Sequence, residues 1–330
     1  MHITKDTHLC ISIIVTGRCN CNCEYCHFFA NHDRNEYNID IDDDLFQQYI
    51  FVIQELQKIT PHITCRFSGG EPLFMGKKVF ELSEKLYQQT GLKPYILSNG
   101  QLLSKENIHH AKENHISSFV VSVENPFLIS KGAFATDMVI EKFSHLQNKD
   151  VPLFLGMLVL PNHQFKNIKK IADYFWDKIK MIPPMCEVNF LPYRSPTQEE
   201  LDDLYHNVYQ VVKEYNGKSN ISLFPYIIPE YYPNNSEQTE FLVEFPLVDT
   251  MNIKRDGYSA VVEKLEIKME NSYSQYACPN INCDWADSCK VIKWVWKMNT
   301  DKIPTNKKLE DYCRFKKVLS QAFYDALSEE

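Results

Sequence analysis

The sequence has little positive charge and no extended basic region. Its 43 acidic residues outnumber the 35 basic ones, which gives a formal net charge of −8. One local cluster, Lys166, Lys169 and Lys170, falls on a predicted helix. Proteins that bind a phosphate backbone derive much of their affinity from basic side chains. Nucleic acid is therefore not expected as a substrate or partner.

The sequence also lacks a secretory signal and any apolar run long enough to cross a membrane. The first ten residues are polar and include His2, Lys5, Asp6 and His8, whereas a signal peptide needs an apolar core. The longest apolar stretch, 152–161, is about half of the ~20 residues that a transmembrane helix requires. We expect a cytoplasmic monomer with no membrane partner.

The eleven cysteines are not expected to form disulfides, because the cytosol keeps thiols reduced. Four of them lie within 19–26 and four within 278–313, while Cys10, Cys65 and Cys186 are scattered. This uneven spacing predicts two metal centres, one near each end of the sequence.

Short β-branched runs alternate with stretches of helical periodicity, a pattern that predicts βα units and a parallel sheet. Strands are predicted at 11–15, 63–67, 94–97, 119–123, 153–159 and 187–191. Helices are predicted at 43–59, 77–89, 104–114, 137–148, 167–178 and 197–215. An alternating segment over 252–264, around Gly257, predicts a β-hairpin.

The first cysteine group follows the first predicted strand. Cys19, Cys23 and Cys26 have the spacing C-x3-C-x2-C. Three thiolates on one short loop bind three irons of a cubane cluster and leave the fourth iron open to a ligand. Zinc is the alternative, but structural zinc normally takes four ligands in paired sets, and Cys21 would be an awkward fourth ligand.

This loop resembles the hallmark motif of the radical S-adenosylmethionine (SAM) superfamily. The resemblance includes Tyr25, whose family counterpart packs near the adenine of SAM. It continues at the end of the second predicted strand, where Gly69, Gly70, Glu71 and Pro72 resemble the GGEP motif. The motif implies that the glycines let the backbone approach the methionine part of SAM and that the Glu71 carboxylate accepts hydrogen bonds from its ammonium group.

Further along the chain, the resemblance rests on polar residues at strand ends. Ser98 and Asn99 end the third predicted strand, and Ser122 and Glu124 end the fourth, where family members hold the ribose and carboxylate of SAM. Family members often have Asp and then Gly where this chain has Glu124 and Asn125. Leu191, at the end of the sixth strand, is a candidate for apolar contact with the adenine.

The resemblance implies an α/β fold, a partial (β/α)6 TIM-like barrel with a small cysteine-rich C-terminal domain. The expected domains are a radical SAM core over 1–195, a helical or irregular connection over 196–250, and an auxiliary-cluster domain over 251–330. The implied chemistry is reductive cleavage of SAM to a 5′-deoxyadenosyl radical that abstracts hydrogen from a substrate. The electron implies a reducing partner such as flavodoxin or ferredoxin.

The second cysteine group consists of Cys278, Cys283, Cys289 and Cys313. Four thiolates are enough to hold one auxiliary [4Fe–4S] cluster, and they would also close a zinc site. The group resembles the C-terminal part of the SPASM domain of radical SAM enzymes that modify peptides and proteins. Its first spacing is x4 where that domain has x2, and an earlier cysteine pair is missing, so we expect a truncated version with one cluster.

The resemblance predicts an enzyme that modifies a peptide or protein by epimerisation, oxidation or cross-linking. A radical SAM enzyme for a small molecule is one alternative, and a non-catalytic zinc-binding protein is another. The sequence does not identify a catalytic acid, base or hydrogen donor.

Overall fold

The structure is a computed structural model of the chain. It describes residues 2–23, 26, 28, 35–128, 136–147, 149–156, 158–161, 164–188, 194–218, 223, 240–249, 251–274 and 306–328. The chain divides into two compact units, of which the first comprises Met1–Ser122, Ser130–Phe154 and Glu237–Gln275. The second comprises Val123–Ile129, Leu155–Ser236 and Tyr276–Glu330. Among the described residues, no helix is long and apolar enough to span a membrane.

The first unit is built on a six-stranded sheet with the order β5-β4-β3-β2-β1-β8. Its strands are β1 (His8–Thr16), β2 (Ile63–Gly69), β3 (Tyr95–Ser98), β4 (Ser118–Val121), β5 (Leu153–Leu155) and β8 (Glu240–Phe245). The pairs β1–β2, β2–β3, β3–β4 and β1–β8 are all parallel. The predicted α/β class with a parallel sheet, as in a partial TIM-like barrel, is confirmed.

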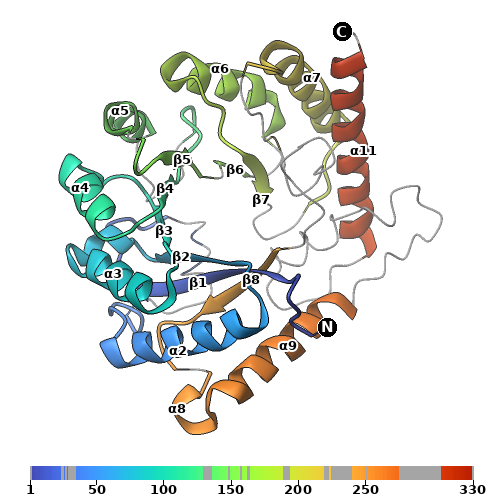
Figure 1. Cartoon of the computed structure of the whole chain (residues 1–330). Helices are drawn as coiled ribbons and strands as arrows, with labels where there is room; N and C mark the ends of the chain where they lie inside the picture. The colour runs from blue at the N-terminus through green and yellow to red at the C-terminus, as the bar shows by residue number, and fades with distance from the viewer. Residues whose placement is uncertain are drawn as a thin grey trace. The chain divides into compact units, whose positions relative to one another are not determined.

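Among the described residues of this unit, the first four helices follow the strands in the predicted order, whereas the last two were not predicted. They are α2 (Asp43–Ile59), α3 (Lys78–Thr90), α4 (Lys105–Glu113), α5 (Thr136–Leu146), α8 (Ile253–Asp256) and α9 (Tyr258–Ser274). Figure 1 shows α2, α3 and α4 on the outer side of the sheet, with α9 running beside α2. The start of α2 is fixed by Asp42, whose side chain accepts a hydrogen bond from the backbone N–H of Leu45 at 2.7 Å.

The core of the first unit lies between α2 and one face of the sheet. Phe46 of α2 meets Phe67 of β2 edge-on, with ring centroids 6.0 Å apart. Tyr49, one turn further along α2, lies 4.7 Å from the ring of Phe245 on β8. All four side chains are fully buried, and aromatic pairs at such distances add to the stabilisation that comes from area burial.

The second unit combines a two-stranded parallel sheet with long helices. The strands are β6 (Leu158–Pro161) and β7 (Met185–Val188), and the helices are α6 (Ile168–Ile179), α7 (Gln198–Tyr215) and α11 (Asn306–Ser328). The helix α7 begins with a capping box formed by Thr197 and Glu200. Figure 1 shows α11 packed along α7, and the Tyr205 hydroxyl of α7 donates to Asp325 of α11 at 2.5 Å.

Two predictions about secondary structure are wrong, and one strand was missed. The single strand predicted at 153–159 is two short strands, β5 and β6, which belong to different sheets and flank Gly156. The hairpin predicted at 252–264 is helical: Gly257 has φ +81° and ends α8 instead of forming a hairpin turn. Val261 and Leu265, four residues apart on α9, are both buried. The strand β8 was not predicted at all.

Candidate functional site

The first cysteine group lies on a loop that leaves the carboxyl end of β1. The loop is held at its start by Asp40, whose carboxylate accepts hydrogen bonds from the Thr16 hydroxyl at 2.6 Å and from Nε of Arg18 at 2.8 Å. The guanidinium of Arg18 also lies 5.2 Å from the ring centre of Phe74. These contacts fix the path of the backbone where it enters the cysteine motif.

Four thiols are concentrated in this loop, and all of them are half-buried. They belong to Cys19, Cys21, Cys23 and Cys26. The backbone N–H of Cys26 donates to the carbonyl of Cys23 at 3.2 Å. The Cys19 and Cys23 thiols are hydrogen-bonded neighbours of Cys21 and raise its pKa. Within the described residues, no three His, Cys, Asp or Glu side chains are placed to hold a single metal ion.

The two glycines of the Gly69-Gly70-Glu71 motif pack directly against this loop. Gly70 donates its N–H to the carbonyl of Thr16 at 2.8 Å, and Glu71 donates its N–H to the carbonyl of Arg18 at 2.8 Å. A Cβ on Gly70 would lie 2.2 Å from the Arg18 carbonyl oxygen, and one on Gly69, which has φ +121°, would lie 2.1 Å from that of Thr16. The approach of two backbone segments therefore requires both glycines.

Glu71 joins the carboxyl ends of β2 and β3. Its side chain is fully buried. One carboxylate oxygen accepts from the Leu73 N–H and the Ser98 hydroxyl, both at 3.0 Å. The other accepts from the Asn99 N–H at 2.6 Å. Burial raises the pKa of Glu71 to about 7, although the hydrogen bonds from Asn99, Leu73 and Ser98 act in the opposite direction.

These contacts give Glu71 a positioning role that the sequence motif does not imply. The motif implies a Glu71 carboxylate that accepts hydrogen bonds from SAM, whereas three protein donors already bind it in this structure. A carboxylate offers about four lone-pair positions, so at most one acceptor position remains. Glu71 thereby positions Ser98 and Asn99 relative to the Gly69–Gly70 turn.

The residues after β3 direct amide donors at the cysteine loop. Nδ2 of Asn99 lies 2.8 Å from the Asn20 side-chain oxygen, 3.5 Å from the Cys21 sulfur and 3.9 Å from the Cys19 sulfur. Nε2 of Gln101 lies 2.9 Å from the Cys21 sulfur. Half-buried thiols that face hydrogen-bond donors suit thiolate ligands of an iron–sulfur cluster, since such bonds tune the cluster. Gln101 was not predicted from the sequence.

The remaining predicted SAM residues are distributed as follows. Ser122 is exposed at the carboxyl end of β4, and its N–H donates to the Ser98 carbonyl at 2.8 Å. Glu124 and Asn125 belong to the second unit and are buried. Tyr25 and Leu191 lie outside the described residues.

The second cysteine group is described at one position only. Cys313 is half-buried on α11. Cys278, Cys283 and Cys289 lie outside the described residues. Their shared metal centre therefore stays a prediction.

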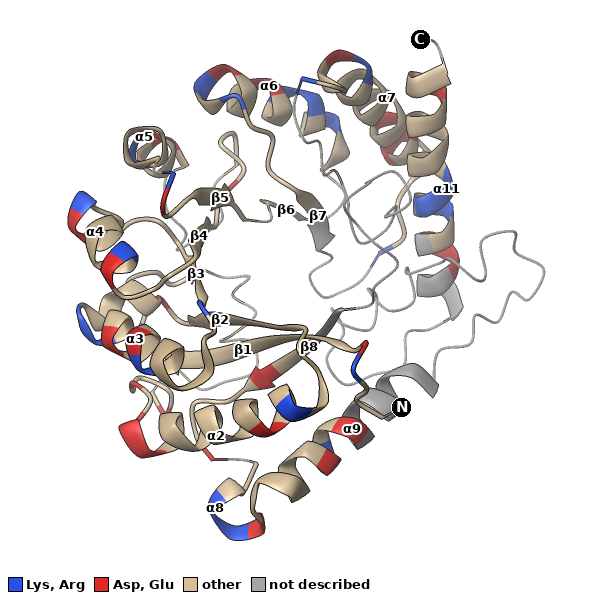
Figure 2. Cartoon of the chain, in the orientation of Figure 1, with Lys and Arg blue, Asp and Glu red and all other residues tan. Residues whose placement is uncertain are grey.

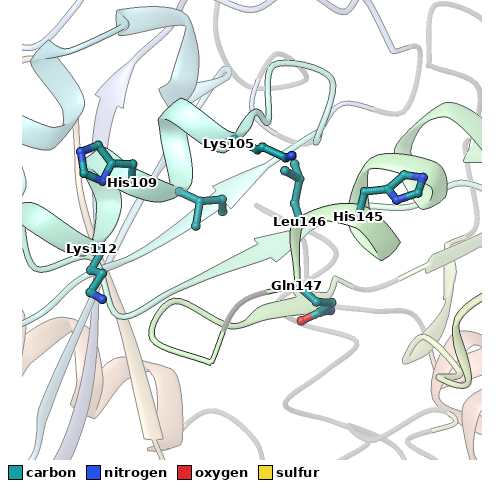
Figure 3. Close-up of a pocket in the computed structure, with 7 residues that line it drawn as sticks. Lys105, His109, Lys112, His145, Leu146 and Gln147 are labelled. Carbon is teal, nitrogen blue, oxygen red and sulfur yellow. The ribbon is translucent and has the colours of Figure 1, made fainter.

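A pocket of about 400 Å³ lies away from these residues, between α4 and the end of α5 (Figure 3). Lys105, His109 and Lys112 contribute from α4, and His145 and Gln147 from the other side. The ammonium group of Lys112 is 2.6 Å from Asp150. No predicted site residue lines this pocket.

The half-buried cysteine loop and the glycine-rich turn lie at the carboxyl edge of a parallel sheet, which is the edge on which barrel enzymes build their sites. Residues 13–175 match the family model of the radical SAM superfamily. The chain belongs to the radical SAM superfamily, whose members use a [4Fe–4S] cluster and SAM.

Solved structures of low sequence identity share the fold. The structure of native anSMEcpe with bound AdoMet has a TM-score of 0.70 at 17% identity, over 96% of this chain and 99% of that chain. SuiB of Streptococcus suis bound to S-adenosylmethionine has a TM-score of 0.52 at 15% identity, over 88% of this chain and 73% of that chain. No curated protein matches this chain.

Proposed function

We propose that Cys19, Cys23 and Cys26 hold a [4Fe–4S] cluster and that the chain uses SAM to abstract hydrogen from a peptide or protein. The observation that carries this proposal is the contact between the residues that follow β1, β2 and β3. The thiols after β1 face the amide of Asn99 after β3, and Glu71 after β2 holds Asn99 in place.

The chain's own residues bind and orient the reacting groups. When bound, the cluster and SAM supply an electron and a carbon-centred radical. Asp40 and Arg18 fix the entry of the cysteine loop, and the Asn99 amide donates toward Cys19. Ser98, Asn99, Ser122 and Glu124 stay candidates for the ribose and carboxylate of SAM, with Tyr25 and Leu191 near the adenine. The anSMEcpe and SuiB structures each contain bound SAM.

The peptide or protein substrate class is supported by the C-terminal cysteines. The spacing of Cys278, Cys283, Cys289 and Cys313 resembles a truncated SPASM domain, which accompanies peptide-modifying radical SAM enzymes. We infer one auxiliary [4Fe–4S] cluster on these four residues and a reducing partner such as flavodoxin or ferredoxin. A small-molecule substrate is the second candidate, because truncated one-cluster domains also occur in radical SAM enzymes for small molecules.

Zinc binding is the alternative for the first group, and it would need Cys21 as the fourth ligand. Its thiol is a hydrogen-bonded neighbour of those of Cys19 and Cys23, so the loop does offer four thiols. The cluster hypothesis and the zinc hypothesis differ in the thiols that they require. A cubane cluster requires Cys19, Cys23 and Cys26, whereas a tetrahedral zinc site requires Cys21 as well.

The deciding experiment is anaerobic reconstitution with iron and sulfide, followed by addition of dithionite and SAM. We expect 5′-deoxyadenosine from the wild type and a change in the electron paramagnetic resonance of the reduced cluster when SAM binds. Cys23→Ala removes both signals, and the matched control Cys21→Ala retains them. A chain that retains zinc, and that loses its metal equally in both variants, contradicts the proposal.

A further inference from the structure

The face of the six-stranded sheet that points away from α2 carries polar side chains, which are exposed or half-buried on β2 and fully buried at Ser12 of β1. Along β2, Ile63, Cys65 and Phe67 are buried, whereas the alternate residues Thr64 and Arg66 are exposed and half-buried, respectively. Phe67 packs on α2. Because successive side chains of a strand point to opposite faces, Arg66 projects from the other face.

The strand register places a polar row across this face. Ser12 of β1 pairs with Arg66 of β2 and with Glu244 of β8, and Tyr95 of β3 pairs with Arg66 and with Ser118 of β4. Arg66 is the one lysine or arginine in the six strands. Figure 2 shows these strands mostly tan, with blue and red concentrated on the helices. Glu244 is exposed and lies two strand spacings, about 10 Å, from Arg66.

Arg66 is only partly satisfied by its surroundings. Its guanidinium is a neighbour of the Tyr95 hydroxyl, which also lies 3.6 Å from the Cys10 sulfur. Its Nε is buried and has no hydrogen-bond partner. None of the ion pairs in the described part of the chain involves Arg66. A guanidinium presents five donors in a planar fork that matches a carboxylate, and here that fork lacks its anion.

The row lies directly beneath the proposed SAM site. Arg66 precedes Gly69 by three residues on the same strand, which is about 10 Å. The hydroxyl of Ser12, at the level of Arg66, lies 2.8 Å from that of Ser68, two residues further along β2. A group bound at Arg66 would therefore lie on this face of the sheet, one level below the glycine turn.

We propose that Arg66, assisted by the Tyr95 hydroxyl, binds a carboxylate of the substrate. The inference rests on the proposed function and names the chemistry of its substrate: an acidic side chain or free carboxylate that anchors the molecule below SAM. Charge-assisted, bidentate pairing gives such a contact both strength and orientation. The chain's net charge of −8 works against binding of acids in general, so a preference for them requires a local cation.

The test is a competition between matched acids and amides. Reconstituted, unreduced protein with S-adenosylhomocysteine is equilibrated with a pool of short peptides, each present once with glutamate and once with glutamine at one position. N-acetylglutamate and N-acetylglutamine serve as the small-molecule pair. Bound and free fractions are separated by filtration and quantified by mass spectrometry. We expect the wild type to enrich the acids about tenfold, Arg66→Gln to abolish the enrichment, and Arg66→Lys to keep part of it.

The controls distinguish carboxylate binding by Arg66 from a purely structural role of this residue. They also distinguish a failure of this proposal from a failure of the proposed function. Arg255→Gln, which removes an exposed arginine paired with Asp256, should enrich acids like the wild type. Tyr95→Phe should lower the enrichment severalfold, and it stands in for Arg66→Gln if that variant does not fold.

Equal retention of acids and amides by the wild type overturns the proposal, as does unchanged enrichment by Arg66→Gln. A matching loss of S-adenosylhomocysteine affinity in Arg66→Gln overturns it too, because Arg66 would then belong to the SAM site. Since the protein is not reduced, failure of SAM cleavage leaves this result intact.

Discussion

The backbone N–H of Asn99 donates a 2.6 Å hydrogen bond to the buried carboxylate of Glu71. This bond connects the turn after β2 to the turn after β3. The Asn99 side chain in turn points at the thiols of the cysteine loop after β1. The three strand ends are thus coupled through one carboxylate, so a change at Glu71 should reach the cluster without touching it.

Glu71→Gln tests this coupling. Glutamine keeps the shape but replaces one acceptor oxygen by an NH₂ group, so a buried donor among Leu73, Ser98 and Asn99 loses its partner. We expect a loss of about 1–3 kcal/mol in the free energy of unfolding and lower iron retention after reconstitution. Urea unfolding of the metal-free protein and iron analysis measure the two effects. Unchanged values in both assays would show that Glu71 does not position Asn99.

The raised pKa of Glu71 predicts that the free energy of unfolding depends on pH. The pKa of Glu71 is about 7 in the folded chain and near its ordinary 4.5 in the unfolded chain. The folded state therefore binds the proton more tightly, and Glu71 stabilises the fold below pH 4.5. This contribution falls as pH rises through 7, by on the order of 3 kcal/mol. The difference in unfolding free energy between the wild type and Glu71→Gln, measured from pH 4.5 to 8, should shift against the wild type as pH rises; a difference that stays constant over this range would contradict the prediction.

Gly70→Ala should disrupt the packing of the cysteine loop on β2. The added Cβ would lie 2.2 Å from the Arg18 carbonyl oxygen, so the loop backbone has to move. We expect a loss of about 1–3 kcal/mol, as for other overpacked sites, and poor iron incorporation. Gly91→Ala is the matched control: its φ is +73° but no atom lies within 4 Å of the new Cβ. It should cost about 1 kcal/mol and load iron normally, whereas equal iron loading of both variants would argue against a role for this contact.

Asn99→Ala should make the cluster harder to reduce. The Asn99 amide donates toward the sulfur of Cys19, a predicted ligand, and hydrogen bonds to cluster sulfurs set the reduction potential. We expect a midpoint potential lower by on the order of tens of millivolts in an anaerobic titration followed by electron paramagnetic resonance. Gln101→Ala removes the amide that faces Cys21, which is not a predicted ligand, and should shift the potential less. A larger shift in Gln101→Ala would instead indicate that Cys21 is a ligand.

Local sequence pattern was sufficient for much of the barrel. The helix α2 has the bounds that its periodic apolar face predicts, and the strands β1 to β4 lie where the β-branched runs are. The cysteine loop and the glycine turn were found because each is a compact motif at a strand end. In both cases the signal is contained in a few consecutive residues.

What the sequence did not reveal depends on contacts between distant residues. β8 follows a Pro- and Tyr-rich stretch and pairs with β1, from which it is separated by most of the chain. Arg66 and Gln101 are single polar residues without a motif, and their surroundings exist only after the strands have paired. Gly257 fits either a hairpin turn or a helix end, and the burial of Val261 and Leu265 favours the helix.

Tyr49→Phe tests how β8 is held at the edge of the sheet. The Tyr49 side chain is fully buried, and its hydroxyl donates to the carbonyl of Pro246, the residue after β8, at 2.6 Å. Removing the hydroxyl leaves that carbonyl without this donor while the ring contact with Phe245 remains. We expect a loss of about 1–2 kcal/mol in the free energy of unfolding. We also expect the substitution to accelerate amide hydrogen exchange more in β8 than in β2. Tyr324→Phe, at a side chain that is 62% exposed, should change stability by less than about 0.5 kcal/mol. If exchange in β8 stays unchanged, the strand is held by its pairing with β1 and by the aromatic contact, and the hydroxyl is dispensable.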